Sequence, residues 1–232
     1  MAKGPFDPGF DALPRVISIF PLTGVLLLPG GVLPLNIFEP RYLAMVRDAL
    51  ATETRIIGMI QPRVPDLDDN RGAGGSAVGD ERPDIYRTGC AGRITGFNES
   101  SDGRYILSLT GLCRFDIGEE MADKDGYRRV LADYRTYRDD LGGAPEPDID
   151  RARLLTIVRA YFDNQGIGLD WDSVEAANDE RLVTSLAMTC PFGPNERQAL
   201  LEAPGTTERA AIVTTLLEMA LAETGDASAA SH

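Results

Sequence analysis

Three cysteines and one histidine are the side chains of this sequence with the clearest potential for catalysis. Cys90, Cys113 and Cys190 lie far apart and lack the Cys-x-x-Cys spacing of redox and zinc sites. His232 is the last residue, so no imidazole is positioned to activate a serine or a thiol. The sequence therefore predicts reduced structural thiols, no metal site, and neither a Ser-His-Asp nor a Cys-His mechanism.

An acidic, glycine-rich segment at residues 63–84 is the second place where chemistry could occur. From Asp66 onward it has the early ligand spacing of a calcium loop. However, Arg71 occupies the position that requires glycine, and Ala77 occupies the position that requires glutamate. A glycine-rich loop also offers no dry, concave site that would shift the pKa of a carboxyl pair. We expect a mobile, solvated surface loop without a bound cation.

Charge and composition exclude several other functions. The 232 residues include 23 Lys and Arg against 36 Asp and Glu, a net charge of −13, which disfavours nucleic acid and anionic membranes as partners. Lys3 and Lys124 are the only lysines, and neither follows the glycine pattern of a phosphate-binding loop. No apolar run reaches the ~20 residues of a membrane span, and the N-terminus lacks an export signal. We therefore expect a cytoplasmic globular protein that binds no cofactor.

The elements that must position any site are mostly strands in the first part of the chain and helices in the second. Apolar runs interrupted by prolines predict edge or bulged strands of a curved sheet. The expected elements are strands at residues 16–22, 25–29, 32–38, 55–60 and 128–137, and a helix at 41–51. After the Gly/Pro-rich residues 142–147, the apolar period becomes helical. The expected helices there cover residues 149–164, 180–188, 195–201 and 207–223.

A hairpin is the strongest local pattern. Residues 88–99 and 104–117 flank Asp102-Gly103, a pair that favours a tight turn. In the second arm, one face is apolar and carries Tyr105, Leu107, Leu109, Gly111, Cys113, Phe115 and Ile117. The other face carries Ser108, Thr110, Arg114 and Asp116. This alternation predicts a half-buried antiparallel strand with Cys113 in the core.

Three blocks of residues together resemble a known family. The first contains Phe20-Pro21-Leu22, Pro29-Gly30, Pro34-Leu35 and Phe38-Glu39-Pro40-Arg41-Tyr42; the second, Gly89-Cys90-Ala91-Gly92-Arg93-Ile94, Asp102-Gly103-Arg104-Tyr105, Gly111 and Arg114-Phe115; the third, Arg181-Leu182-Val183, Cys190-Pro191-Phe192 and Ala199-Leu200-Leu201. In this order they resemble the substrate-binding domain that begins bacterial Lon proteases and also occurs as free-standing proteins.

The resemblance implies a fold and a domain organisation. It implies an α+β protein, in which a PUA-like curved antiparallel β pseudo-barrel is followed by a helical bundle. Together with the change of period, this gives an N-terminal extension (1–13), a sheet lobe (14–140), a linker (141–147), a helical lobe (148–224) and a disordered tail (225–232).

The resemblance also implies a function without catalysis. It implies a module that recognises unfolded or client proteins and peptides, with a role as an adaptor in protein quality control. A Lon-type protease or a chaperone is a further expected partner. The ATPase module and the Ser-Lys protease module of a full-length Lon protease are not expected here.

The block around Phe38 is the candidate binding site, and two interpretations of it stay open. In one, the aromatic rings pack, Glu39 favours a helix N-terminus, and Arg41 pairs with a carboxylate. In the other, these residues line a groove that recognises peptides. The candidate peptide-binding residues are Phe38, Glu39, Arg41, Tyr42, Arg93 and Arg114.

Two other functional classes remain as alternatives. The first is a hydrolase or a thiol enzyme, for which Cys90 would be activated by a nearby arginine or a helix terminus. The second is RNA binding by analogy with PUA-like folds. Fold alone does not carry function, and the acidity and scarcity of lysine disfavour RNA.

Overall fold

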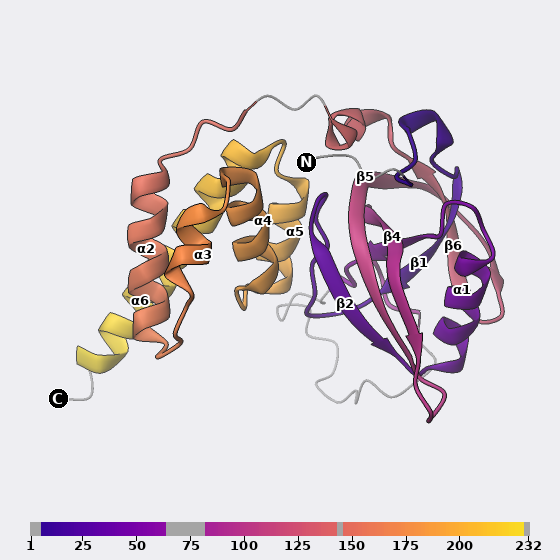
Figure 1. The fold of residues 1–232 in the computed structure, drawn as a ribbon, viewed down its shortest axis with the longest axis horizontal. Helices are drawn as coiled ribbons and strands as arrows, with labels where there is room; N and C mark the ends of the chain where they lie inside the picture. Colours follow the sequence, from indigo (N-terminus) through magenta and orange to yellow (C-terminus); the bar gives the residue numbers. More distant parts are fainter. Residues whose placement is uncertain (1–5, 64–81, 143–145, 230–232) are drawn as a thin grey trace, which may run out of the picture. The chain divides into compact units, whose positions relative to one another are not determined.

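The chain divides into two compact units, residues 1–141 and 142–232. Figure 1 shows the computed structural model, which describes residues 6–63, 82–142 and 146–229. The first unit holds the strands, and the second holds helices alone among its described residues. Most of the predicted loop at residues 63–84 lies outside the described residues.

A single mixed sheet forms the first unit. Its strands are β1 (Val16–Pro21), β2 (Val32–Ile37), β3 (Ile56–Ile60), β4 (Thr88–Glu99), β5 (Tyr105–Lys124) and β6 (Tyr127–Asp133). They follow the order β2-β5-β4-β3-β1-β6, and β5 also pairs with β6, which closes a barrel. All pairs are antiparallel except β1 with β3. The fold is therefore α+β, as predicted.

Strand β5 organises the sheet because it has three partners. It pairs with β4 from Tyr105 to Asp116, while β2 pairs with its residues 105–110 and β6 with its residues 116–124. Residues 105–110 alternate buried side chains with exposed or half-buried ones, as the predicted hairpin requires, whereas residues 111–115 are all buried. The ring of Phe115 is fully buried, and Gly58 and Gly89 leave it room, since a Cβ at either would lie within 3.0 Å of that ring.

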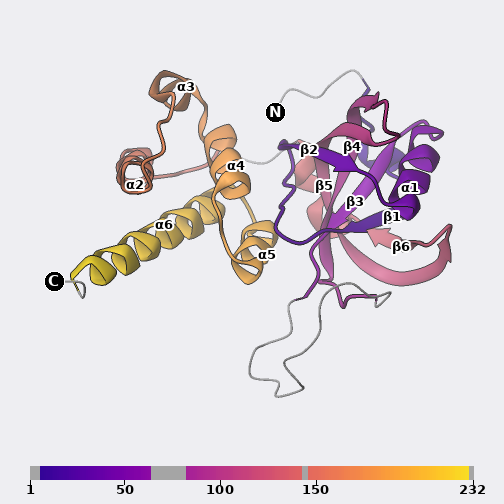
Figure 2. The same cartoon turned by 90° about the horizontal axis from the view of Figure 1, so that it is seen from below.

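Helix α1 (Pro40–Leu50) packs against β1, β3 and β6, and Figure 2 shows it beside these strands. Pro40 lies in the first turn, where its missing N–H costs nothing. Tyr42, Met45, Val46 and Ala49 form the buried side of the helix. Short 3-10 helices, η1 (Phe10–Ala12) and η2 (Arg135–Leu141), flank the barrel strands in sequence.

One predicted strand is wrong, and another ends four residues early. Residues 25–29 form no strand, although Leu26, Leu27 and Leu28 are buried; the segment instead presses against β5, where the carbonyl oxygen of Leu28 would lie 2.0 Å from a Cβ at Gly111. The strand predicted at residues 128–137 ends at Asp133, because η2 follows. Conversely, β5 extends seven residues beyond the predicted end at 117, to Lys124.

The second unit consists of α2 (Arg151–Asn164), α3 (Trp171–Ala176), α4 (Asp179–Thr189), α5 (Pro194–Glu202) and α6 (Thr206–Ala229). Asp150, Asp170 and Asn178 cap α2, α3 and α4 by accepting backbone N–H bonds. Arg151 joins these helices, since its Nη2 donates to the carbonyls of Glu175 and Ala177 at 2.8 and 2.9 Å.

Two features of this unit differ from the predicted elements. The six-residue helix α3 was not expected, because it is too short to show a helical period. Helix α6 continues to Ala229, past the start of the predicted disordered tail at residue 225.

Candidate functional site

The predicted block around Phe38 connects the end of β2 to the start of α1. Tyr42 is buried, with its ring 4.3 Å from that of Phe20, and burial raises the pKa of its hydroxyl. Arg41 lies over the Tyr42 ring at 4.7 Å, and its Nη2 is 2.9 Å from a Glu39 carboxylate oxygen. Phe38 is 62% exposed. The block therefore combines a packed, ion-paired half with one aromatic ring that faces solvent.

The other two predicted arginines have different partners in other parts of the sheet unit. Arg93, on β4, donates to Asp7 at 2.9 Å. Arg114, on β5, is 4% exposed; its Nε and Nη2 donate to the two oxygens of Asp140 at 2.9 and 2.7 Å. Burial disfavours the charge of Arg114, but Asp140 outweighs this effect and raises the pKa of Arg114. Arg114 is therefore buried and not on the solvent-exposed face that alternation predicts. The three predicted arginines pair with three different carboxylates, Arg41 with Glu39, Arg93 with Asp7 and Arg114 with Asp140.

Phe38 instead continues a row of exposed apolar side chains along the outer face of the sheet. We define the outer strip as Val32, Pro34, Phe38 and Ile106. Val32 and Ile106 are 57% and 50% exposed, and Pro34 is also exposed. In the sheet, Pro34 is opposite Ser108, and Asn36 is opposite Ile106. Directly opposite residues share one face, so β2 and β5 present this strip together.

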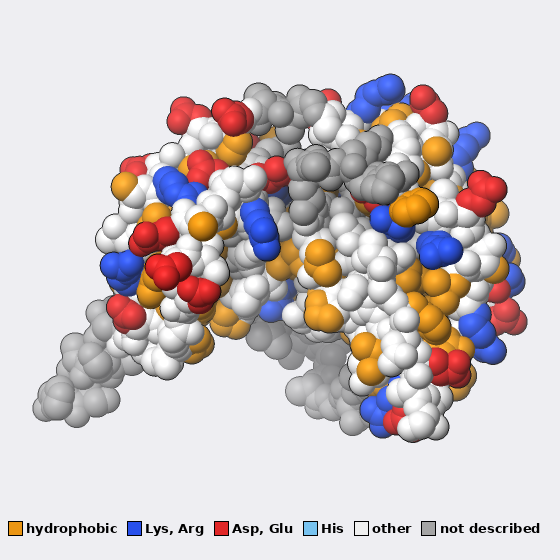
Figure 3. Space-filling view, viewed as in Figure 1, with side chains coloured by type: hydrophobic (Ala, Val, Ile, Leu, Met, Phe, Trp, Pro, Cys, Tyr) orange, Lys and Arg blue, Asp and Glu red, His pale blue; other side chains and the backbone are white. Residues whose placement is uncertain are grey.

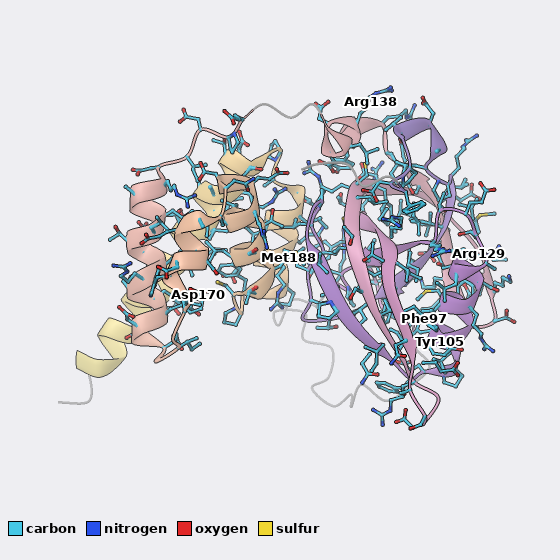
Figure 4. The ribbon with its side chains drawn as sticks, viewed as in Figure 1. Phe97, Tyr105, Arg129, Arg138, Asp170 and Met188 are labelled. Atoms are coloured by element: carbon cyan, nitrogen blue, oxygen red, sulfur yellow. The ribbon has the colours of Figure 1, made fainter. Side chains whose placement is uncertain are left out.

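The residues that alternate with the outer strip along β2 and β5 point toward the core. Leu35 and Ile37 on β2 are buried, as is Leu107 on β5. Beside them, Phe97 of β4 is 44% exposed and meets Tyr105 edge-on at a centroid distance of 5.1 Å. Figure 4 shows both rings near the end of the β4–β5 hairpin.

Charges near the outer strip are compensated locally. The guanidinium of Arg104 lies 5.8 Å over the Phe38 ring, and its Nε is 2.9 Å from a carboxylate oxygen of Asp102. Arg41 and Glu39 form the neighbouring pair. Figure 3 shows hydrophobic side chains over the strands of this unit, bordered by groups of both signs. The surface is therefore close to electrically neutral, and its apolar side chains alternate with the polar Asn36 and Ser108 on the same face.

Sequence reasoning found Phe38 but missed Val32, Pro34 and Ile106. The available signal was alternation within residues 32–38, where even-numbered positions face outward and odd-numbered positions face the core. Several apolar residues on the same outward face of a strand are the informative observation, because single exposed apolar residues are common.

Comparison with known families identifies the chain. The profile of the family described as the ATP-dependent protease La (LON) substrate-binding domain matches residues 16–219. The chain belongs to this family. The match includes β1 to β6 and most of the second unit.

Curated relatives of this LON domain are much longer proteins. A Lon protease from Anaeromyxobacter dehalogenans is 30% identical over 109 residues, which are 47% of this chain and 12% of that protein. Lon protease 2 from Myxococcus xanthus is also 30% identical over 109 residues, again 47% of this chain and 12% of that protein. The similarity thus concerns a small part of these proteases.

Solved structures confirm the fold. A Lon N-terminal domain protein from Xanthomonas campestris matches with a TM-score of 0.55 and 21% identity, over 89% of this chain and 97% of that one. The N-terminal domain of the Mycobacterium avium complex Lon protease matches with a TM-score of 0.57 and 15% identity, over 88% and 98%.

The thiols of this LON domain are buried. Cys90 and Cys113 are 0% exposed, and Cys190 is 1% exposed. Burial, reinforced by Asp140 against the opposing effect of Arg114, raises the pKa of Cys113 to about 12. Burial alone raises the pKa of Cys190 to about 11. Since the thiolate is the nucleophile, these two thiols are poorly suited to catalysis.

The described residues offer neither a metal-binding cluster nor a membrane-spanning helix. Within residues 6–63, 82–142 and 146–229, no three His, Cys, Asp or Glu side chains are grouped so that they could hold a metal ion. In the same part of the chain, none of the helices combines the length and the apolar character needed to cross a bilayer.

Proposed function

We propose that this protein is a non-catalytic recognition module that binds exposed apolar segments of other proteins through the outer strip. The observation that carries the proposal is the row of half-exposed apolar side chains along β2 and β5. Contiguous apolar patches on a monomer surface are typical of interaction sites. The paired charges around the strip favour uncharged segments over acidic peptides or nucleic acid.

Family membership supports the class of ligand, because the family is named for substrate binding in a protease. We further propose that the protein acts as an adaptor in protein quality control, with unfolded clients on one side and a Lon-type protease or a chaperone on the other. Its three cysteines form no disulfide with one another, which is typical of a reducing compartment, and we place the protein in the cytoplasm.

A peptide-binding measurement tests the proposal. The probe is a fluorescein-labelled nonapeptide with valine at alternate positions, threonine between them, a lysine at one end and a glutamate at the other. Its binding is measured by fluorescence anisotropy. We expect the double variant Phe38→Ser/Ile106→Ser to bind about thirtyfold more weakly, since each half-buried side chain would contribute about 1 kcal/mol.

The matched control is Ile167→Ser, which removes a side chain of similar exposure, 51%, from the second unit. This variant should bind the probe as the unaltered protein does. Equal affinity of the double variant and the control would remove the outer strip from the function. Absence of probe binding by the unaltered protein would refute the recognition of apolar segments.

A further inference from the structure

Strand β2 is an edge strand, because among the residues that the structure describes it pairs with β5 alone. The N–H of Gly111 donates to the carbonyl of Gly31 at 2.8 Å, and Val32 is opposite Thr110. In an antiparallel ladder, this pattern directs the backbone groups of odd-numbered residues of β2 toward β5. Those of even-numbered residues then face the free edge. Pro34 agrees, since a proline in a strand is tolerated where its nitrogen faces away from the ladder.

The free edge therefore carries a defined row of hydrogen-bonding groups. Val32 and Asn36 present both N–H and C=O, and Pro34 presents its C=O, which gives two donors and three acceptors. Backbone groups of this kind require partners when they leave water. The same even-numbered residues point their side chains to the outer face of the sheet, and two of them, Val32 and Pro34, belong to the outer strip.

We propose that the ligand binds as an added β-strand, an extended uncharged polypeptide segment hydrogen-bonded to the free edge of β2. This inference rests on the proposed function and specifies how the same surface would hold its ligand. Backbone bonds to Val32, Pro34 and Asn36 would supply affinity that is independent of ligand sequence. Side chains at alternate ligand positions would lie beside the outer strip, which selects apolar residues.

The edge fits a foreign segment better than a second copy of β2. Pro34 removes a donor from the middle of the edge. Two β2 edges paired together would combine two such gaps, whereas a segment without proline brings its full set of donors. Proline on an edge strand is one of the devices by which proteins disfavour self-association.

Two N-methylated versions of the valine–threonine probe test strand addition on the unaltered protein. One version is N-methylated at the valines, and the other is N-methylated at the threonines between them. In an added strand, N–H groups of one parity face β2 and those of the other parity face solvent. We expect one version to lose more than about twentyfold in affinity and the other to stay within about twofold of the parent.

A pair of protein variants provides the second test. Asn36→Pro and Asn36→Ala both remove the side chain, but only Asn36→Pro removes the N–H at the free edge. We expect Asn36→Pro to bind the parent probe about fivefold more weakly than Asn36→Ala, the factor for one net hydrogen bond of about 1 kcal/mol. Circular dichroism of both variants shows whether the sheet is retained.

The results separate this inference from the function on which it rests. If Phe38→Ser/Ile106→Ser weakens binding but both methylated probes bind alike, the outer strip binds peptide and strand addition is wrong. A dimer that dissociates in Asn36→Pro would assign the edge to a second copy and also overturn the inference. If the parent probe does not bind at all, both proposals fail.

Discussion

At the scale of single residues, the contact between Arg114 and Asp140 is the feature least accessible to sequence reasoning. Alternation places Arg114 on the polar face of its strand, but η2 brings Asp140 over it. The backbone N–H of Arg114 also donates to Asp140 at 2.9 Å, and its guanidinium lies 4.7 Å from the Tyr137 ring centroid. An arginine that sequence reasoning assigned to recognition therefore fastens η2 to the barrel.

Asp140→Ala should destabilise the protein strongly. It leaves the guanidinium of Arg114 buried without its carboxylate, a change that costs about 3–5 kcal/mol in comparable cases. Urea denaturation measures the loss. The neighbouring variant Asp139→Ala, which removes an exposed carboxylate, should change the free energy of unfolding by less than about 0.5 kcal/mol. Equal effects of the two variants would contradict a structural role for the buried ion pair.

The buried thiols predict a loss of stability at alkaline pH. The pKa of Cys113 is raised to about 12 and that of Cys190 to about 11, against an ordinary value of 9.0. Above pH 9 the thiols of the unfolded chain lose protons that the folded chain retains, so stability falls as pH rises toward the folded values. Below pH 9 this contribution is fully present.

Each thiol should therefore lower the free energy of unfolding by about 1 kcal/mol per pH unit between pH 9.5 and 10.5. Urea denaturation of the double variant Cys113→Ala/Cys190→Ala should show a flatter dependence on pH than the unaltered protein. Identical slopes would mean that both thiols ionise as readily in the folded chain as in the unfolded one.

At the scale of elements, local patterns were sufficient where each strand or helix has one buried face. The β4–β5 hairpin and the helices α2, α4 and α5 follow from turn residues, caps and apolar period. The segment 25–29 could not be predicted, since its leucines are buried by packing rather than by strand pairing. The candidate site was predicted in part, because Phe38 belongs to a recognisable block whereas Ile106 joins it only through the register of β2 with β5.

Gly111→Ala should disrupt the contact between β5 and the segment before β2. The new Cβ would lie 2.0 Å from the Leu28 carbonyl oxygen, a backbone atom that cannot rotate away. Overpacking of this kind typically costs about 1–3 kcal/mol or more. Thermal unfolding measures the loss. Gly96→Ala, whose Cβ would meet Ser108 at an ordinary 3.5 Å, should be tolerated, and a similar loss in both variants would argue against the close approach at Gly111.

At the scale of the whole molecule, the net charge of −13 is unevenly distributed. Residues 1–140 hold 17 basic and 21 acidic residues, a net of −4, which leaves −9 for residues 141–232. The second unit thus carries most of the negative charge, and the unit that bears the outer strip is nearly balanced. Acidity of the chain as a whole therefore describes solubility better than it describes the binding surface.

A balanced binding surface predicts little dependence of peptide affinity on salt. The affinity for the valine–threonine probe should change by less than about twofold between 50 and 500 mM sodium chloride, since contacts between uncharged groups are not screened. An RNA oligonucleotide measured in parallel distinguishes the alternative, because phosphate contacts weaken steeply with salt. Tight, salt-sensitive RNA binding would contradict the proposed function.

The closure of the barrel also has a consequence for the order of folding. Strand β1, at Val16–Pro21, pairs with β6, at Tyr127–Asp133, so the barrel cannot close until more than a hundred further residues have left the ribosome. Contacts this distant in sequence form late. During synthesis the β4–β5 hairpin can form first, while the edge of β1 that pairs with β6 is still unpaired. The growing chain is itself, for that interval, an unfolded apolar segment of the kind that the finished protein is proposed to bind.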